Sequence, residues 1–327
     1  MKKILVTGGA GYIGSFIVRQ LKEDGFRPVI IDNLSQGHAE AIKDFELHRI
    51  DLVTEPKKLD DFFTKNKITG VIHMASFIQM GESFRNPGKY FKNNLEGANN
   101  LFNAMANHDV KNIVFSSSAG VYGSPEKLPI KERDPKDPEN PYGETKLMIE
   151  RMLHWYDQAF GIKSISIRYF NAAGAALDGS IGEAHPGESH IIPLIILAAL
   201  KKKKFTLFGD DYNTKDGTCV RDYIHVLDLA KAHTLAINKL INGCDTNSFN
   251  AGTGKGYSNL EIVKEIEKFT GKFDWEFGPR RPGDADSLYA ANSKIKKELG
   301  WKPKYGLKEI IESAYRWHKI HPNGYES

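Results

Sequence analysis

The stretch Thr7-Gly8-Gly9-Ala10-Gly11-Tyr12-Ile13-Gly14 places glycines 8, 11 and 14 at a spacing of three between a predicted strand and a predicted helix. The run Lys3 to Thr7 is typical of a short buried strand, and Tyr12 to Leu21 carries apolar residues at helical spacing. The first glycine permits a tight turn, the second lets the backbone approach a pyrophosphate, and the third lets helix and strand pack closely. The free N–H groups at the start of the helix favour phosphate. The stretch therefore predicts a dinucleotide-binding turn.

A glycine turn alone also fits a purely structural turn, so the residue that ends the next strand matters. Asp32 ends the predicted strand Pro28 to Asp32, eighteen residues past Gly14. A carboxylate there accepts hydrogen bonds from ribose hydroxyls and repels a 2′-phosphate, which predicts NAD rather than NADP. Asn33 can add an amide to the same ribose.

Strand and helix patterns alternate along roughly the first 170 residues. Further strands are predicted at 47–52, 70–74, 112–117 and 164–169, and helices at 59–65, 93–108 and 142–160. This alternation predicts an α/β fold with a Rossmann-type doubly wound parallel sheet.

The alternation ends after Asn171, and the chain of 327 residues is long for one ordinary domain. We expect an NAD-binding domain at 1–171 and a smaller α/β substrate-binding domain at 172–327. The part near 248–252 can return to the first domain's sheet. Residues 174–189 are rich in Gly, Pro, Ala and charge, and are predicted to form a loop that closes over a ligand.

Composition excludes several classes of protein. The formal net charge is only +4, from 45 basic and 41 acidic residues, which gives no electrostatic footprint for nucleic acid or a membrane. Cys219 and Cys244 lie far apart, so they suggest neither a disulfide framework nor a metal centre, and we predict no metal. The longest apolar stretch, 191–200, is too short to span a bilayer. Residues 1–3 lead straight into a strand without a signal peptide, so we expect a reducing cytoplasm.

A second motif, Pro141-Tyr142-Gly143-Glu144-Thr145-Lys146, opens a predicted helix. Tyr142 and Lys146 are four residues apart and share a helix face, although alone they also fit an ordinary surface pair. A phenol has a pKa of about 10, and a nearby ammonium together with a nicotinamide ring would lower it. Lys146 can also bind the nicotinamide ribose. Ser116-Ser117-Ser118 ends the fifth strand at the carboxyl edge of the sheet, where a serine can share a proton between substrate and Tyr142.

With these residues the chain resembles the extended short-chain dehydrogenase/reductase family and, within it, the sugar 4-epimerases of the UDP-glucose/UDP-galactose type. The resemblance runs nearly from end to end. Its segments are TGGAGYIG (7–14), DNL (32–34), FSSSAGVYG (115–123), PYGETK (141–146), RYFNAAGA (168–175), FGDDYNTKDGTCVRDYIHVLDLA (208–230), PRRPGD (279–284) and HPNGYE (321–326). The first and fourth are common in the superfamily, whereas 168–175 and 208–230 are more particular to the epimerases.

The resemblance implies a mechanism in which Tyr142 as a phenolate takes the proton of the sugar 4-hydroxyl while the C4 hydride passes to NAD. The keto sugar then turns about its link to the diphosphate, and the hydride returns to the other face. NAD is therefore expected to stay bound through many cycles while the chain positions the sugar. The resemblance also implies a homodimer through the helices at 93–108 and 142–160.

The resemblance also assigns residues to each ligand, with Tyr142, Lys146 and Ser118 as the catalytic group. NAD would be bound by Gly8, Gly11, Tyr12, Ile13, Gly14, Asp32, Asn33, Asp51, Leu52, Met74, Ala75, Asn93, Ser116, Tyr142, Lys146 and Tyr169. The UDP-sugar would be bound by Ser118, Tyr142, Phe170, Asn171, His190, Ile191, Thr206, Phe208, Arg221, Arg281, Asp284 and Leu288. The planar fork of an arginine suits a diphosphate, although Arg221 and Arg281 could instead form salt bridges. Thr206 and Phe208 could equally belong to an edge strand.

The chain departs from the family pattern at three positions. Ile78 stands where some members carry a lysine that helps to hold the cofactor, which implies weaker retention of NAD. His190 stands where many have an asparagine near the UDP, so that this contact could vary with pH. Leu288 stands where a bulky tyrosine limits the space around the sugar C2 substituent in some members, which leaves access open to an N-acetyl sugar.

Several alternative activities follow from the same scaffold. A UDP-GlcNAc/UDP-GalNAc or UDP-pentose 4-epimerase is a specificity variant. A nucleotide-sugar 4,6-dehydratase would need an Asp-Glu pair where Ala119-Gly120 stand. A non-catalytic NAD-sensing protein could dispense with Tyr142 and Lys146, and both are present.

Overall fold

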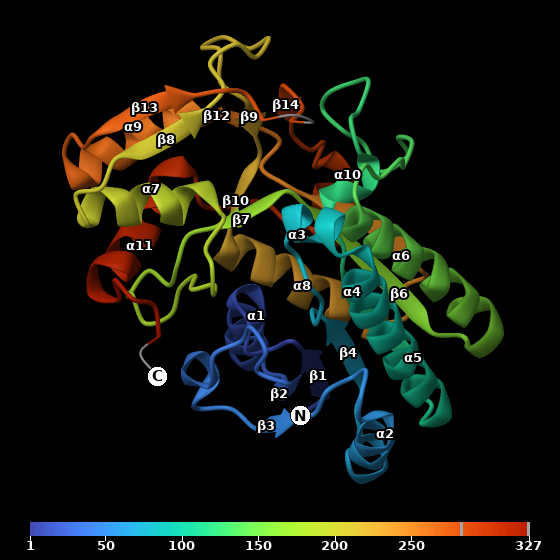
Figure 1. Cartoon of the computed structure of the whole chain (residues 1–327). Helices are drawn as coiled ribbons and strands as arrows, with labels where there is room; N and C mark the ends of the chain where they lie inside the picture. Colours follow the sequence, from blue (N-terminus) through green and yellow to red (C-terminus); the bar gives the residue numbers. More distant parts are fainter. Residues whose placement is uncertain (282–283, 326–327) are drawn as a thin grey trace.

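The computed structural model describes residues 1–281 and 284–325, and its centre is a seven-stranded sheet (Figure 1). The strand order is β3-β2-β1-β4-β5-β6-β11, and every neighbouring pair is parallel. The strands are β1 (Lys3–Thr7), β2 (Arg27–Asp32), β3 (Leu47–Arg49), β4 (Gly70–His73), β5 (Asn112–Ser116), β6 (Lys163–Tyr169) and β11 (Asn247–Ala251). This confirms the predicted Rossmann-type sheet.

Helices cover both faces of the sheet, because successive strand residues point to opposite sides. Ile4 and Val6 of β1 belong to one apolar cluster, which also holds residues of α1 (Tyr12–Glu23) and α8 (Val226–Ile241). Leu5 belongs to a second cluster on the other face. That cluster is built with the helices α2 (Pro56–Lys65), α5 (Gly97–Asn107) and α6 (Pro141–Phe160).

A smaller α/β unit stands beside the carboxyl ends of these strands (Figure 1). Its helices share one apolar cluster and are α7 (Ile191–Leu200), α9 (Asn259–Thr270) and α11 (Leu307–Ile320). Its short sheets pair β8 (Phe205–Phe208) with β13 (Trp275–Gly278), β7 (Asn171–Ala173) with β10 (Tyr223–His225), and β9 (Val220–Arg221) with both β12 (Tyr257–Ser258) and β14 (Ser287–Leu288). The remaining elements are α3 (Met80–Arg85), α4 (Pro87–Tyr90), α10 (Ser293–Leu299), a π-helical turn at Phe91–Glu96 and 3-10 turns at Ala39–Ile42 and Ala119–Tyr122.

The chain returns to the first unit after residue 225. Strand β11 pairs with β6, and α8 packs against α1 and β5. The predicted boundary at residue 172 therefore divides the chain in sequence but not in space, since 226–251 pack with the large sheet.

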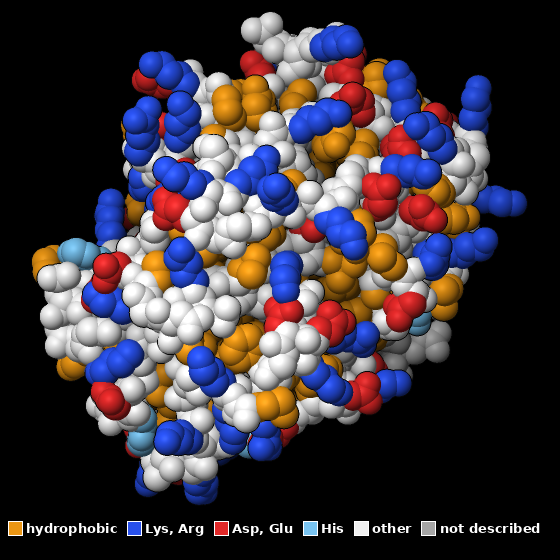
Figure 2. Space-filling model, turned by 180° about the vertical axis from the view of Figure 1, so that it is seen from behind, with side chains coloured by type: hydrophobic (Ala, Val, Ile, Leu, Met, Phe, Trp, Pro, Cys, Tyr) orange, Lys and Arg blue, Asp and Glu red, His pale blue; other side chains and the backbone are white. Residues whose placement is uncertain are grey.

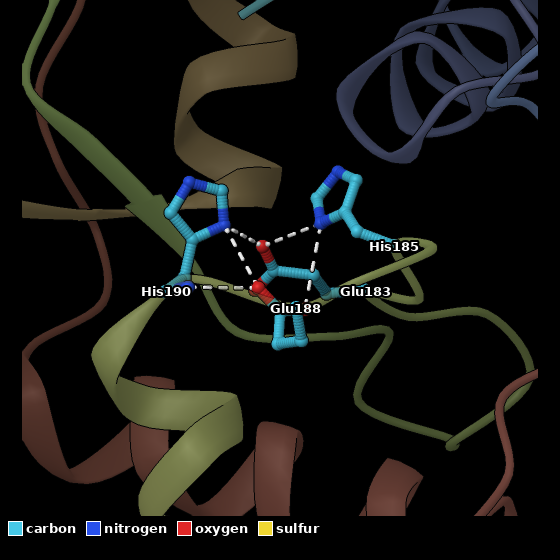
Figure 3. Close-up of side chains that lie close together, drawn as sticks. All are labelled: Glu183, His185, Glu188 and His190. Atoms are coloured by element: carbon cyan, nitrogen blue, oxygen red, sulfur yellow. Dashed lines mark hydrogen bonds and ion pairs between the residues drawn. The ribbon is translucent and has the colours of Figure 1, made fainter. Parts of the chain in front are cut away.

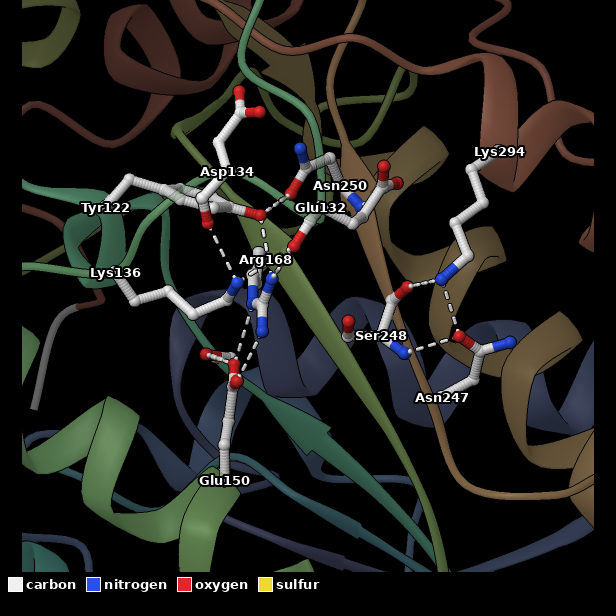
Figure 4. Close-up of polar contacts among 11 residues, drawn as sticks. Tyr122, Glu132, Asp134, Lys136, Glu150, Arg168, Asn247, Ser248, Asn250 and Lys294 are labelled. Carbon is white, nitrogen blue, oxygen red and sulfur yellow. Dashed lines mark hydrogen bonds and ion pairs between the residues drawn. The ribbon is translucent and has the colours of Figure 1, made fainter. Parts of the chain in front are cut away.

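A buried polar network fastens β11 and β6 to α6 (Figure 4). The guanidinium of Arg168 donates to Glu150 through Nε at 2.9 Å and Nη2 at 2.5 Å, and through Nη1 to the Tyr122 hydroxyl at 2.8 Å. That hydroxyl donates to Oδ1 of Asn250 at 2.7 Å. The network thus links strands that are distant in sequence.

The surface carries charges of both signs. Figure 2 shows lysine and arginine side chains interspersed with aspartate and glutamate over one whole face. Among the described residues, no helix has the length and apolar character needed to cross a membrane. The free cysteines of this part of the chain are Cys219 and Cys244.

Candidate active site

A cavity of about 760 Å³ lies at the carboxyl ends of the sheet strands, between the two units. Of the predicted cofactor residues, Ser116 alone is not part of its lining. Of the predicted substrate residues, those in the lining are Ser118, Tyr142, Phe170, Asn171, His190, Arg221, Arg281, Asp284 and Leu288. The structure therefore brings most of both predicted sets around one space.

The glycine turn needs its glycines for steric reasons. Gly8 has a φ of +70°, and a Cβ there would lie 2.6 Å from the backbone nitrogen of Ala75. A Cβ on Gly14 would lie 2.2 Å from the carbonyl oxygen of Gly8. Gly11 caps α1 without a side-chain hydrogen bond, so the first N–H groups of that helix stay free for a phosphate.

Asp32 is held in place by the turn that it faces. Its carboxylate accepts hydrogen bonds from the backbone N–H of Ala10 at 3.0 Å and of Leu34 at 2.8 Å. Burial raises the pKa of Asp32, and these two backbone donors oppose that rise. The amide of Asn33 donates to Asp51 at 2.7 Å, which couples two of the residues predicted to contact the adenosine half of NAD.

Lys146 is almost fully buried, with 2% of its surface exposed. Its Nζ donates to the hydroxyl of Ser76 and to the carbonyl oxygen of Ser116, both at 2.8 Å. Burial lowers the pKa of Lys146 to about 7. Ser76 follows β4 without any recognisable motif, so this partner of Lys146 could not be predicted from sequence.

Tyr142 lies beside Lys146, whose Nζ is 5.7 Å from the centre of the phenol ring. Burial and then the neighbouring Tyr169 raise the pKa of Tyr142, and a hydrogen bond with Ser118 lowers it. Burial thus opposes the predicted lowering of this pKa, and the positive ring of a bound nicotinamide is the other predicted source of that lowering.

The start of α6 fixes the position of Tyr142. Asn140 caps the helix by accepting the N–H of Gly143 at 2.8 Å, and Pro141 occupies the first turn. Thr145 donates to the carbonyl of Tyr142 at 2.7 Å and accepts from Asn94 at 3.0 Å. The α6 start is thereby tied to the π-helical turn, a link that no local pattern indicates.

Two serines of the predicted triplet have different surroundings. Ser118 begins the 3-10 turn, and its Oγ accepts the N–H of Gly120 at 3.0 Å. Ser116 is buried behind the cavity wall, where its hydroxyl donates to Tyr169 at 3.1 Å. Ser116 thus lies outside the cavity lining and is linked to the site through the bond of its carbonyl oxygen with Lys146.

The wall opposite the glycine turn carries two arginines. Arg221 donates to the carbonyl of Ala285 at 2.8 Å and lies 4.0 Å from a carboxylate oxygen of Asp284. The guanidinium of Arg281 lies 4.3 Å from the centre of the Phe208 ring. The PRRPGD motif also contains Pro282 and Gly283, and HPNGYE ends at Glu326; these three residues lie outside the described ranges.

Three predicted substrate residues do not line the cavity. Ile191 begins α7, and Thr206 and Phe208 belong to β8, where Thr206 pairs with Glu276 of β13. The strand pairing of Thr206 and Phe208 fits the alternative prediction that both belong to an edge strand. Phe208 reaches the site only through its contact with Arg281.

His190 lines the cavity, but its Nδ1 lies 2.5 Å from Oε1 of Glu183. Burial lowers the pKa of His190, whereas Glu183 and Glu188 outweigh this effect and raise the pKa to about 10. The predicted change of this contact with pH is therefore not expected near neutrality.

A glycine turn for a dinucleotide, an acidic residue at the end of β2 and a buried Tyr–Lys pair together define an NAD-dependent enzyme of the short-chain dehydrogenase/reductase class. A family model matches residues 4–252, and the chain belongs to the NAD dependent epimerase/dehydratase family.

Relatives and solved structures agree with this assignment. The chain is 48% identical over 327 residues to a UDP-glucose 4-epimerase of Halalkalibacterium halodurans, covering 99% of this chain and 98% of that protein. It is 45% identical to a UDP-glucose 4-epimerase of Bacillus subtilis, covering 99% of each. A crystal structure of UDP-glucose 4-epimerase superposes with a TM-score of 0.97 at 45% identity over 100% of both chains. The Bifidobacterium longum enzyme, solved with NAD⁺ and UDP, gives a TM-score of 0.92 at 37% identity over 99% and 100%.

Proposed function

We propose that this chain is a UDP-glucose 4-epimerase, an isomerase that interconverts UDP-galactose and UDP-glucose with NAD held in the cavity. The observation that carries the proposal is the continuity of this cavity. It runs from the glycine turn past Tyr142 and Lys146 to Arg221 and Asp284. One chain can therefore hold a dinucleotide and a nucleotide sugar together, with the Tyr–Lys pair between them. The named relatives cover nearly the whole chain and support the same activity.

The residues of the cavity then have distinct tasks. When bound, NAD supplies the acceptor, and later the donor, of the C4 hydride, so the net redox change is zero. Tyr142 removes the proton of the 4-hydroxyl and gives it back after the sugar has turned, with Ser118 sharing that proton. Lys146 binds the nicotinamide ribose. Arg221 and Arg281 bind the diphosphate, which leaves the sugar free to rotate.

The chain lacks the acid–base pair that a nucleotide-sugar 4,6-dehydratase would need after β5. Ala119 and Gly120 form the start of the 3-10 turn and line the cavity where elimination would need an acid and a base. Neither side chain can transfer a proton. A purely NAD-sensing role would not require the buried Lys146 beside Tyr142.

The experiment uses proton NMR to monitor the interconversion of UDP-galactose and UDP-glucose. Purified protein offered UDP-galactose without added NAD is expected to produce UDP-glucose until equilibrium is reached. Conversion that requires added NAD would indicate an exchanging cofactor, as Ile78 suggests, and would leave the activity intact. Absence of conversion with excess NAD would refute the proposal.

A second activity, 4-epimerisation of UDP-N-acetylhexosamines, is favoured by Leu288. This side chain lines the cavity and is only partly exposed. We expect UDP-GalNAc to be converted alongside UDP-galactose. Leu288→Tyr should lower kcat/KM for UDP-GalNAc by about 10–200-fold, the range for steric discrimination in a pocket, with little change for UDP-galactose. An equal loss for both sugars would assign Leu288 a general structural role instead.

The proposal includes a homodimer through α5 and α6 and a cytoplasmic setting. On α6, Trp155 is 68% exposed and Phe160 is 49% exposed, and a large apolar side chain left in solvent favours a partner surface. Sedimentation should give twice the chain mass of 36.7 kDa. A monomer at micromolar concentration would contradict the dimer.

The free thiols Cys219 and Cys244 are compatible with a reducing compartment, which cell fractionation tests.

A further inference from the structure

Four side chains from the segment 183–190 converge on one point in the wall of the cavity (Figure 3). They are Glu183, His185, Glu188 and His190, in the pattern E-x-H-x-x-E-x-H. Each offers one ligand atom, and these atoms all lie within 4.8 Å of one another. The proposed mechanism gives none of these four residues a task, although His190 was predicted to contact the UDP-sugar, so the cluster needs its own explanation.

Three distances within the cluster are close to the edge length of a metal coordination tetrahedron. Zinc ligands at about 2.0–2.1 Å from the ion lie about 3.3–3.4 Å from each other. Nδ1 of His185 lies 3.3 Å from Oε1 of Glu183 and 3.5 Å from Oε2 of Glu188, and Nδ1 of His190 lies 3.4 Å from Oε1 of Glu188. To bind one ion, Nδ1 of His190 and Oε1 of Glu183, now 2.5 Å apart, would have to separate, and Glu188 would have to present a single oxygen.

A network of ion pairs alone leaves one polar atom unsatisfied. Among the described residues, Nδ1 of His185 is buried and has no partner in hydrogen-bond geometry, although two carboxylates face it as ion-pair partners. Glu183 is only 3% exposed, and a buried carboxylate is costly without full compensation. A cation between the four groups would satisfy this nitrogen and both carboxylates at once.

Contacts around the cluster hold its segment in place. Nε1 of Trp317 donates to the carbonyl of Glu183 at 3.1 Å, and Nε2 of His38 lies 2.9 Å from the carbonyl of Ala184. The backbone N–H of His190 donates to Glu188 at 2.8 Å. The backbone that carries the ligand groups is therefore held by α11 and by the segment after β2, in the way that surrounding contacts orient metal ligands.

We propose that Glu183, His185, Glu188 and His190 bind one divalent ion of the zinc class as a structural site. Two imidazoles with two carboxylates suit zinc better than magnesium or calcium, and four protein ligands leave no open position for catalysis. The ring of His185 lies 6.2 Å from that of Tyr12, at the start of α1. The ion would thus fix the 174–190 loop beside the glycine turn. The sequence prediction of no metal considered cysteines and did not recognise this pattern.

The first experiment measures zinc uptake by the full chain without substrate. Protein treated with a chelator is dialysed against zinc chloride and its metal content is determined by mass spectrometry. We expect one zinc per chain in the unmodified protein and in the control His48→Asn/Glu46→Gln, which alters an exposed His–Glu pair at 2.9 Å. The double variant His185→Asn/Glu188→Gln should lose this zinc. Uptake that is absent from the unmodified protein, or unchanged in that variant, would overturn the proposal.

Two further readouts keep the test independent of how well the variant folds. Cobalt added to the unmodified protein should give the visible absorption of a tetrahedral site, and a purely octahedral spectrum would refute that geometry. Saturating zinc should raise Tm by about 3–6 °C in the unmodified protein and the control, but not in the double variant. Because these measurements involve no sugar, they stand apart from the outcome of the epimerase assay.

Discussion

Replacing Tyr142 with phenylalanine is expected to lower kcat at least about 100-fold, the usual scale for loss of a general base. The side chain is 7% exposed and keeps its ring packing after the change, so only the hydroxyl is removed. Binding of UDP-glucose, measured by calorimetry, should stay near that of the unmodified enzyme because Arg221 and Arg281 are untouched. The effect should therefore appear in kcat rather than in KM.

The matched control is Tyr156→Phe, on the same helix. Its hydroxyl donates to Asn103 at 2.6 Å on the surface and is not part of the cavity. This variant should keep its turnover. Near-normal turnover in Tyr142→Phe would remove the phenol from the proposed role.

Replacing Arg168 with methionine is expected to destabilise the fold by about 3–5 kcal/mol, the usual cost of removing one partner from a buried ion pair. The side chains of Arg168 and Glu150 are only 4% and 11% exposed, and Glu150 would be left without its cation (Figure 4). The hydroxyl of Ser117, which donates to Glu150 at 2.6 Å, cannot neutralise that charge. Urea unfolding with saturating NAD, monitored by tryptophan fluorescence, measures the loss.

The double variant Arg168→Met/Glu150→Leu separates the charge from the packing. Because it leaves no buried unpaired carboxylate, it should recover a large part of the stability lost in the single variant. A single variant within about 1 kcal/mol of the unmodified protein would mean that Glu150 is solvated or protonated at little cost.

The elements around the glycine turn could be predicted because their signals are local. The glycines, the apolar run of β1 and the carboxylate of Asp32 lie within one βαβ segment, and their spacing carries the steric and electrostatic requirements. The return of α8 to the sheet could not be predicted in this way. Its apolar face would fit either unit, and the choice depends on contacts with α1, which is about 200 residues away in sequence.

The residues of the site likewise divide into those with a local sequence signal and those placed only by tertiary contacts. Tyr142 and Lys146 were identified from a motif, whereas Ser76 and Asn94 act only through tertiary hydrogen bonds from segments without a pattern. The Glu183 to His190 cluster needed the loop conformation as well, because its ligand spacing follows neither helix nor strand periodicity. The pKa of Tyr142 was also beyond sequence reasoning, since burial raises it against the expected lowering.

In the proposed epimerase mechanism, the C4 hydride leaves the sugar and returns to the opposite face within one bound complex. It is tested most directly by following UDP-[4-²H]galactose in ordinary water by NMR. The expected product is UDP-glucose that retains the deuterium at C4. Product with hydrogen from solvent at C4, or no product at all with NAD present, would contradict it.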